Sequence, residues 1–179
     1  MINAIERVLV SEEELNAKVS ELAKQISKDY EGRDLLFITV LKGSFVFAAD
    51  LFRRVTIPAK VDFMSVSSYG SSSKTSGVVK IIKDLDKPIE GLDVIIVEDI
   101  LDSGVTLNYL TQILGQRGPR SLKICTILNK PDRRIAPITA DYVGFDIPDE
   151  FVVGYGLDYD EKYRNLPFVG ILKRSVYES

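Results

Sequence analysis

The chain has 179 residues, 45% hydrophobic and 27% charged, which is the composition of an ordinary globular protein with one core. Its 23 basic and 26 acidic side chains leave a net charge of −3, which argues against general nucleic-acid or membrane binding, since such surfaces carry a basic excess. There is no histidine and only one cysteine, so histidine catalysis, histidine metal sites and an internal disulfide are excluded.

The N-terminal segment predicts a long helix. Ser11 and Glu14 form a capping-box pattern, and apolar residues then recur at helical spacing until Gly32, which is a plausible end. Acidic residues stand among the first apolar ones, unlike a secretory signal, and no apolar run approaches the roughly 20 residues that span a bilayer. We therefore expect a cytoplasmic protein.

The next segments alternate between strands and helices. The apolar run Leu35–Leu41 reads as a buried strand, Lys42-Gly43-Ser44 interrupts it, and residues 45–53 follow as a helix. Residues 61–66 and 78–82 are predicted to pair as a long hairpin. The serine- and glycine-rich stretch between them, residues 67–77, is too polar to pack as core, so we expect a mobile loop.

The second half continues this alternation. Strands are predicted over 94–97, 122–128 and 142–145, with a turn at 102–106 and a helix behind it. The run 122–128 contains Cys125, which we interpret as a buried, unreactive thiol. This order predicts an α/β fold with a mostly parallel central sheet flanked by helices. Ligands of such folds bind at the carboxyl ends of the strands, where residues 42–44, residues 98–106 and Lys130 are expected.

The most informative segment is Val94–Thr106, in which an apolar strand delivers the adjacent carboxylates Glu98 and Asp99 at its end. Asp102 then opens a short turn, and Ser103 and Thr106 supply hydroxyls beside the start of a helix. Backbone N–H groups at such a position favour a phosphate. Carboxylates beside it suit ribose hydroxyls and magnesium, the ion favoured when all protein ligands are oxygens. Acids at strand ends and glycine turns are also common without any such function.

The full string resembles the phosphoribosyl pyrophosphate signature of the type I phosphoribosyltransferases. The resemblance implies that the two acids contact the ribose hydroxyls directly or through magnesium, that the turn wraps the 5′-phosphate, and that Asp102 is the general base. Many relatives carry lysine or arginine where this chain has Val105, a departure that we expect to tune affinity without abolishing activity. The phosphoribosyl pyrophosphate residues implied in this way are Glu98, Asp99, Asp102, Ser103, Gly104, Val105 and Thr106.

Further matches narrow the resemblance to the hypoxanthine-guanine phosphoribosyltransferases. Leu41–Ser44 is similar to their pyrophosphate loop, in which a cis peptide is expected between Leu41 and Lys42, and Phe151–Asp158 is similar to their hood motif. The implied pyrophosphate residues are Lys42, Gly43 and Arg164, with Ser68 and Tyr69 on a flap that closes over the site. The implied purine residues are Lys130, Phe151, Val152 and Asp158, and the implied metal residues are Glu98, Asp99 and Asp158.

Each of these residues also has an ordinary structural interpretation. Lys-Gly-Ser after a strand is usually a simple turn, a lysine such as Lys130 is usually solvated, and Phe151 and Val152 suit core packing. In the family, however, the lysine donates to the 6-oxo group of the purine, and the phenylalanine stacks on the base while the valine bonds it through its backbone. A cationic donor favours an oxo base over adenine, which presents another donor there.

The resemblance implies magnesium-dependent transfer of phosphoribose from phosphoribosyl pyrophosphate to hypoxanthine or guanine, giving IMP or GMP and pyrophosphate in purine salvage. It also implies one domain over 1–179, with a core of about 30–148, a hood from the N-terminal segment and about 149–179, and a homodimer or homotetramer. Three alternatives stay open: a relative that uses xanthine or uracil, a regulator that kept the pocket but lost catalysis, and a generic nucleotide-binding module. The last alternative lacks support, because the chain contains neither the G-x-G-x-x-G motif nor the Walker motif.

Overall fold

A six-stranded sheet forms the centre of the computed structural model, which describes residues 1–68 and 79–178. The strand order is β4-β3-β2-β5-β6-β7, and all neighbours are parallel except β3 and β4, which are antiparallel. The strands are β2 (Leu35–Leu41), β3 (Ala59–Ser68), β4 (Val79–Lys83), β5 (Asp93–Leu101), β6 (Ser121–Asn129) and β7 (Tyr142–Asp146). The predicted fold class is confirmed.

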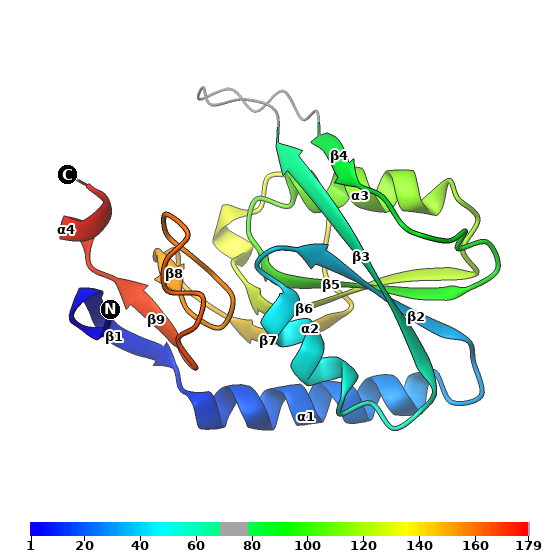
Figure 1. The fold of residues 1–179 in the computed structure, drawn as a ribbon, viewed down its shortest axis with the longest axis horizontal. Coiled ribbons are helices and arrows are strands. Elements are labelled where there is room, and N and C mark those ends of the chain that lie inside the picture. Colours follow the sequence, from blue (N-terminus) through cyan, green and yellow to red (C-terminus); the bar gives the residue numbers. More distant parts are fainter. Residues whose placement is uncertain (69–78, 179) are drawn as a thin grey trace.

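Helices cover both faces of this sheet (Figure 1). Helices α1 (Glu12–Asp29) and α2 (Phe45–Phe52) pack on one face, and α3 (Val105–Gly115) packs on the other. The strands are apolar on both sides because alternate residues enter different cores: in β2, Phe37 joins the α1–α2 core and Ile38 joins the α3 core. Cys125 is buried in the α1–α2 core, as predicted, and burial raises the pKa of its thiol.

Helix α1 begins where the capping pattern predicts. The Glu14 backbone N–H donates to Ser11 Oγ over 3.1 Å, and the Ser11 N–H donates to Glu14 Oε2 over 2.8 Å. The helix ends at Asp29, three residues before Gly32, which has a φ of +74° in the following turn. Among residues 1–68 and 79–178, every helix is too short or too polar to cross a bilayer.

The prediction that β5 ends before Glu98 and Asp99 is wrong. The strand continues to Leu101 because its pairing with β6 extends from Glu98 opposite Thr126 to Leu101 opposite Asn129. The ladder with a neighbouring strand therefore overrides the low strand propensity of the acids. Both carboxylates are held on a rigid strand, and the turn follows only at residue 102.

A second, three-stranded antiparallel sheet joins the two ends of the chain, in the order β1-β9-β8. Its strands are β1 (Ile5–Val10), β8 (Val152–Val153) and β9 (Val169–Leu172), and the short helix α4 (Arg174–Tyr177) follows. Two 3₁₀ turns, η1 (Ile2–Ala4) and η2 (Pro131–Arg133), complete the described elements. This small sheet lies beyond the N-terminal end of α1, at the left of Figure 1. It is built from the segments that the resemblance assigns to the hood.

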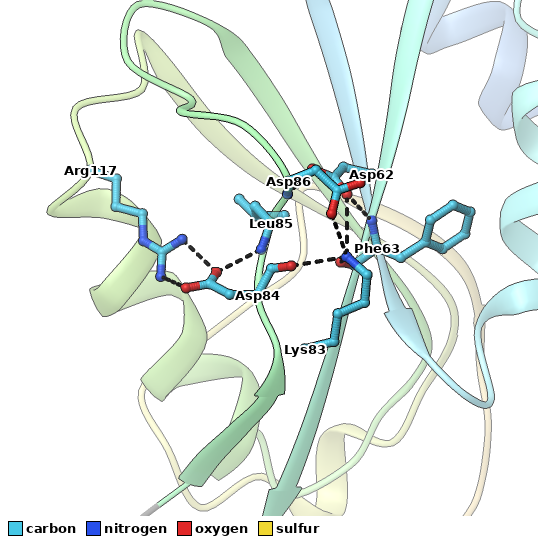
Figure 2. Close-up of polar contacts among 7 residues, drawn as sticks. All are labelled: Asp62, Phe63, Lys83, Asp84, Leu85, Asp86 and Arg117. Carbon is cyan, nitrogen blue, oxygen red and sulfur yellow. Dashed lines mark hydrogen bonds and ion pairs between the residues drawn. The ribbon is translucent and has the colours of Figure 1, made fainter.

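An ionic network fastens β3 and β4 to the end of α3 (Figure 2). Asp62 of β3 is buried, and its Oδ2 accepts the Asp86 backbone N–H over 2.9 Å. Lys83 Nζ donates to the Phe63 carbonyl over 3.0 Å, which ties the end of β4 back to β3. Arg117, just beyond α3, binds the Asp84 carboxylate with two nitrogens at 2.7 and 2.9 Å. These contacts hold the base of the β3–β4 hairpin.

Candidate active site

A cavity of about 260 Å³ opens beside the carboxyl ends of β2 and β5. Polar and glycine residues among its lining are Gly43, Glu98, Asp99, Asp102, Ser103, Gly104 and Thr106. All were predicted from the sequence to contact phosphoribosyl pyrophosphate or its pyrophosphate group. Val105, which belongs to the predicted phosphoribosyl pyrophosphate residues but does not line the cavity, is the first residue of α3. The structure thus brings residues 98–106 and the 41–43 loop together at one edge of the sheet.

Two of the acids that line this cavity, Glu98 and Asp99, have raised pKa values. Burial raises the pKa of Asp99 to about 6, and the nearby charge of Asp158 acts in the same direction, opposed by the Ile100 N–H and by Arg164. Burial also raises the pKa of Glu98 well above its ordinary value, and the adjacent Asp99 charge adds to this. The pair is therefore poised to bind a cation or hydroxyl groups that relieve the repulsion.

One end of this cavity is formed by the turn before α3. Gly104 is the N-cap and has a left-handed φ of +79°, which a residue with a side chain adopts only at a cost. A Cβ there would also lie 2.6 Å from Ile138. Glycine therefore permits the tight entry into an 11-residue helix whose first N–H groups and positive dipole end face the turn.

A second cavity, of about 390 Å³, lies on the other side of Asp102. It is lined by predicted purine residues, namely Lys130, Phe151, Val152 and Asp158. Lys130 is buried just past β6, and its N–H donates to the Leu101 carbonyl over 2.9 Å. Phe151 is 38% exposed, and Tyr177 of α4 stacks on it with ring centroids 4.8 Å apart. An apolar ring and a buried cationic donor thus share one pocket.

Asp102 lines both cavities, as does Ile100. Its carboxylate is held between two cations: Arg133 Nε donates to Oδ1 over 2.9 Å, and Lys130 Nζ lies 3.9 Å from Oδ2. Arg133 also reaches Asp149 at 3.5 Å. These contacts orient the carboxylate at the junction of the two cavities.

The 41–43 loop lies directly against the acids. The peptide between Leu41 and Lys42 is cis, as predicted. A Cβ on Gly43 would overlap the Asp99 carboxylate, so no larger residue fits at this position. Lys42 itself projects out of the cavity, and its Nζ pairs with Glu161 Oε2 at 3.2 Å.

Arg164 is half-buried beside the loop that follows β8. It donates to the Gly156 carbonyl over 2.8 Å and pairs with Asp158 at 3.1 Å and Glu161 at 3.3 Å. Its Nε is buried, and no hydrogen-bond partner for it lies among the described residues. Arg164 borders neither of the two cavities as they stand, although its charge reaches Asp99.

The donor set fits a divalent cation that is shared with a substrate. The described residues contain no group of three His, Cys, Asp or Glu side chains placed to hold a metal together. The predicted ligands Glu98, Asp99 and Asp158 therefore do not form a closed cage. They offer carboxylate oxygens near one another, which suits Mg²⁺, an ion commonly bound by one or two carboxylates together with substrate phosphates.

Several lining residues were not predicted from the sequence. Arg133 follows Lys130 in a basic segment, which was a usable signal, whereas Ile100 and Leu157 resemble any core residue. Tyr177 gave no signal, because only the β8–β9 pairing and α4 bring it onto Phe151. The predicted flap residues, the Ser68 side chain and Tyr69, lie outside the part of the chain that the structure describes.

Comparison with known proteins identifies the family. A model of the phosphoribosyl transferase domain matches residues 10–160. The hypoxanthine-guanine phosphoribosyltransferase of Bacillus subtilis (strain 168) is 54% identical over 179 residues, covering 100% of this chain and 99% of that protein. That of Mycobacterium tuberculosis (strain H37Rv) is 53% identical over 180 residues, covering 97% and 89%.

Solved structures agree with this assignment. A crystal structure of a hypoxanthine phosphoribosyltransferase from Staphylococcus aureus has a TM-score of 0.98 at 50% identity, covering 100% of this chain and 97% of that one. The fold, the acid-lined cavity and these likenesses confirm the resemblance seen in the sequence, and they exclude a generic nucleotide-binding module. The chain belongs to the phosphoribosyltransferase family and, within it, to the hypoxanthine-guanine phosphoribosyltransferases.

Proposed function

We propose that this chain transfers the phosphoribosyl group of phosphoribosyl pyrophosphate to hypoxanthine or guanine, giving IMP or GMP and pyrophosphate in purine salvage. The observation that carries the proposal is the meeting of the two cavities at Asp102. One cavity offers acids and a helix start to a phosphorylated ribose, and the other offers an aromatic ring and a cationic donor to a base. The new bond would join the base in one cavity to the ribose in the other.

In this proposal the purine lies in the larger cavity. Phe151 stacks on the base, the Val152 backbone bonds it, and Lys130 donates to the 6-oxo oxygen. Lys130 is buried, so a purine with an amino group at position 6 would leave the Lys130 ammonium group facing another donor. This disfavours adenine. Asp102 faces the same cavity and, as general base, takes or polarises the proton on the imidazole side of the purine.

The phosphoribosyl group lies in the smaller cavity. Ser103, Gly104, Val105 and Thr106 bind the 5′-phosphate with hydroxyls and N–H groups, while Glu98 and Asp99 hold the ribose hydroxyls. The purine nitrogen displaces pyrophosphate from the anomeric carbon, and the two carboxylates favour the positive charge that the ring gains. Lys42, Gly43 and Arg164 bind the departing pyrophosphate, and Ser68 and Tyr69 cover the site against water.

Membership in the family supports a need for a divalent metal, and we propose that the ion is Mg²⁺. Asp158 and the Glu98–Asp99 pair are the residues that would hold it, together with substrate oxygens. Bound there, Mg²⁺ would neutralise charge on the leaving group.

We also propose that the protein is a cytoplasmic homodimer or homotetramer and a single domain whose small sheet acts as the hood. Large apolar side chains on the β3–β4 hairpin support self-association, since Phe63 is 39% exposed and Ile82 is 64% exposed. In sedimentation velocity, a single species of 20.0 kDa would contradict this oligomer.

The reaction is tested by measuring nucleotide formation from phosphoribosyl pyrophosphate with hypoxanthine, guanine, xanthine, adenine and uracil in parallel, with and without Mg²⁺. We expect Mg²⁺-dependent turnover of oxopurines. Asp102→Ala should lower kcat by about 10²–10⁴-fold, the usual contribution of general acid–base catalysis. Lys130→Ala should lower kcat/KM for hypoxanthine by about 10–150-fold, the value of a hydrogen bond to a charged group.

Lys123→Ala is the matched control, because this lysine also belongs to β6 but pairs with Asp141 at the opposite end of the strand. It should leave both constants nearly unchanged. Binding of phosphoribosyl pyrophosphate without turnover of any base would contradict the transferase proposal and favour a regulatory protein.

A further inference from the structure

Two cations that the proposed function assigns to pyrophosphate are already paired with a carboxylate of the chain itself. Glu161 Oε2 lies 3.2 Å from Lys42 Nζ, and Glu161 Oε1 lies 3.3 Å from Arg164 Nη2. Lys42 and Glu161 are 119 positions apart in the sequence, so their contact forms only where the loop between β8 and β9 meets the 41–43 loop. One carboxylate thus stands where an incoming anion would meet both cations.

The chain presents this carboxylate on a tight turn. The backbones of Tyr159 and Lys162 bond each other in both directions, at 3.1 and 3.0 Å, and enclose Asp160 and Glu161. These two central residues have φ values of +51° and +58°, as in a type I′ turn, where glycine, asparagine and aspartate are preferred. The Glu161 N–H also donates to Asp158 Oδ2 over 2.9 Å. Asp160 suits this turn, whereas Glu161 adopts a backbone conformation that is unfavourable for its residue type and that places its side chain beside the two cations.

We propose that Glu161 is an internal competitor of pyrophosphate and determines how tightly this enzyme holds that group. The inference rests on the proposed function, because it takes Lys42 and Arg164 as pyrophosphate ligands. When pyrophosphate or phosphoribosyl pyrophosphate binds, Glu161 must release both Lys42 and Arg164. When the reaction has ended, Glu161 takes them back and assists departure of the leaving group.

The strength of the effect follows from exposure. The side chains of Lys42 and Glu161 are 65% and 64% exposed, so their pairing is weak and exchanges readily. Pyrophosphate carries more charge than one carboxylate, and it therefore wins the competition at the cost of a modest loss of affinity. Ion pairs of this kind change a binding constant by roughly two- to fivefold, and salt weakens them.

The experiment is calorimetric titration of the whole protein with pyrophosphate in the presence of Mg²⁺. Glu161→Gln keeps the shape of the side chain and removes its charge, and we expect roughly two- to fivefold tighter binding, with the difference shrinking at high salt. The KM for phosphoribosyl pyrophosphate should fall by a similar factor.

Asp160→Asn is the matched control. Asp160 lies in the same turn with a similar φ, but its carboxylate pairs with Lys162 at 2.9 Å and not with the pyrophosphate cations. This variant removes the same charge, and we expect it to leave the affinity for pyrophosphate within about 1.5-fold of the parent protein. In a Lys42→Met background, Glu161→Gln should have a smaller effect, since one of its two partners is gone.

Three outcomes would overturn the inference: equal effects of Glu161→Gln and Asp160→Asn, a full effect without Lys42, or weaker binding in Glu161→Gln. The first would indicate a general charge effect, the second a contact other than Lys42, and the third a role for Glu161 in orienting the cations for the substrate. Failure of the parent protein to bind pyrophosphate at all would instead contradict the proposed function.

Discussion

At the scale of single residues, two acids of the smaller cavity show how a functional site can lower the stability of the folded protein. Glu98 and Asp99 are adjacent on a strand, half-buried, and repel each other when both are ionised. The unfolded chain would solvate both fully. The fold therefore keeps two carboxylates at a cost, and such an arrangement is typical of a site whose ligand supplies the missing positive charge or hydrogen bonds.

This cost predicts a pH dependence of stability. The pKa of Asp99 is about 6 in the folded protein and about 3.9 when unfolded, so the folded state binds the proton more tightly. The contribution of Asp99 to stability is therefore greatest below about pH 4 and is lost as the pH rises toward about 6. The measurement is chemical denaturation of the parent protein and Asp99→Asn in EDTA between pH 4 and 7. Asp99→Asn should gain stability relative to the parent across this interval.

Comparing the two proteins at each pH cancels the titration of distant groups. Glu98 belongs to the same pair, so the difference reports both carboxylates together. A stability difference that stays constant from pH 4 to 7 would show that Asp99 titrates normally.

At the scale of elements, the β3–β4 hairpin depends on polar contacts as well as on core packing. Asp62 accepts the N–H groups of Phe63 over 2.7 Å and Asp86 over 2.9 Å, and Lys83 Nζ lies 3.8 Å away (Figure 2). The pair between Asp84 and Arg117 is closer but more exposed. Burial, more than distance, decides which contact matters for stability, because losing a buried acceptor leaves donors without a partner.

We therefore expect Asp62→Ala to lower the free energy of unfolding by about 1–3 kcal/mol, the cost of removing a buried acceptor and leaving its donors without a partner. Asp84→Ala removes a carboxylate of the same network but should cost only about 0.2–1 kcal/mol, as exposed ion pairs do. Urea denaturation of both variants gives the two values. A larger loss in Asp84→Ala would mean that the exposed pair with Arg117 is what holds the hairpin.

At the scale of the whole molecule, the hydrogen bond between Tyr155 and Asp50 helps to link the small sheet region to the helices of the central sheet. Tyr155, just beyond β8, is buried with a φ of +50°, and its hydroxyl donates to Asp50 Oδ2 of α2 over 2.7 Å. Asp50 also pairs with Arg53 and Arg54 at 3.0 and 3.4 Å. The loop that carries the Asp158 and Arg164 side chains is thus fixed to the helix behind the 41–43 loop.

Tyr155→Phe should lower the free energy of unfolding by about 0.5–1.5 kcal/mol, the usual value of one hydrogen bond. Tyr142→Phe is its control, since Tyr142 of β7 is similarly buried and donates to Asp29 of α1 over the same 2.7 Å, away from the small sheet. We expect similar losses of stability in the two variants but a raised KM for phosphoribosyl pyrophosphate only in Tyr155→Phe. Equal KM values would show that this bond does not position the hood.

Local patterns were enough to predict much of this fold. The capping box of α1, the bounds of β2 and the alternation of strands and helices depend on residues close together in the chain, and each was predicted correctly. The sequence placed the acids, residues 42–44 and Lys130 at one edge of the sheet. This needed only the rule that the carboxyl ends of parallel strands meet at the same edge. The roles of these residues came from the resemblance of a short string, and they stay predictions until the variants are measured.

Other features needed the folded chain, because they join segments that no local pattern connects. The pairing of β1 with β9, the stacking of Tyr177 on Phe151 and the hold of Arg133 on Asp102 are examples. Glu161 between Lys42 and Arg164 is another. A charged surface residue satisfies local propensity with almost any partner, so its partner is selected by how distant elements pack. Elements follow from neighbours in sequence, whereas the electrostatics of the site follow from neighbours in space.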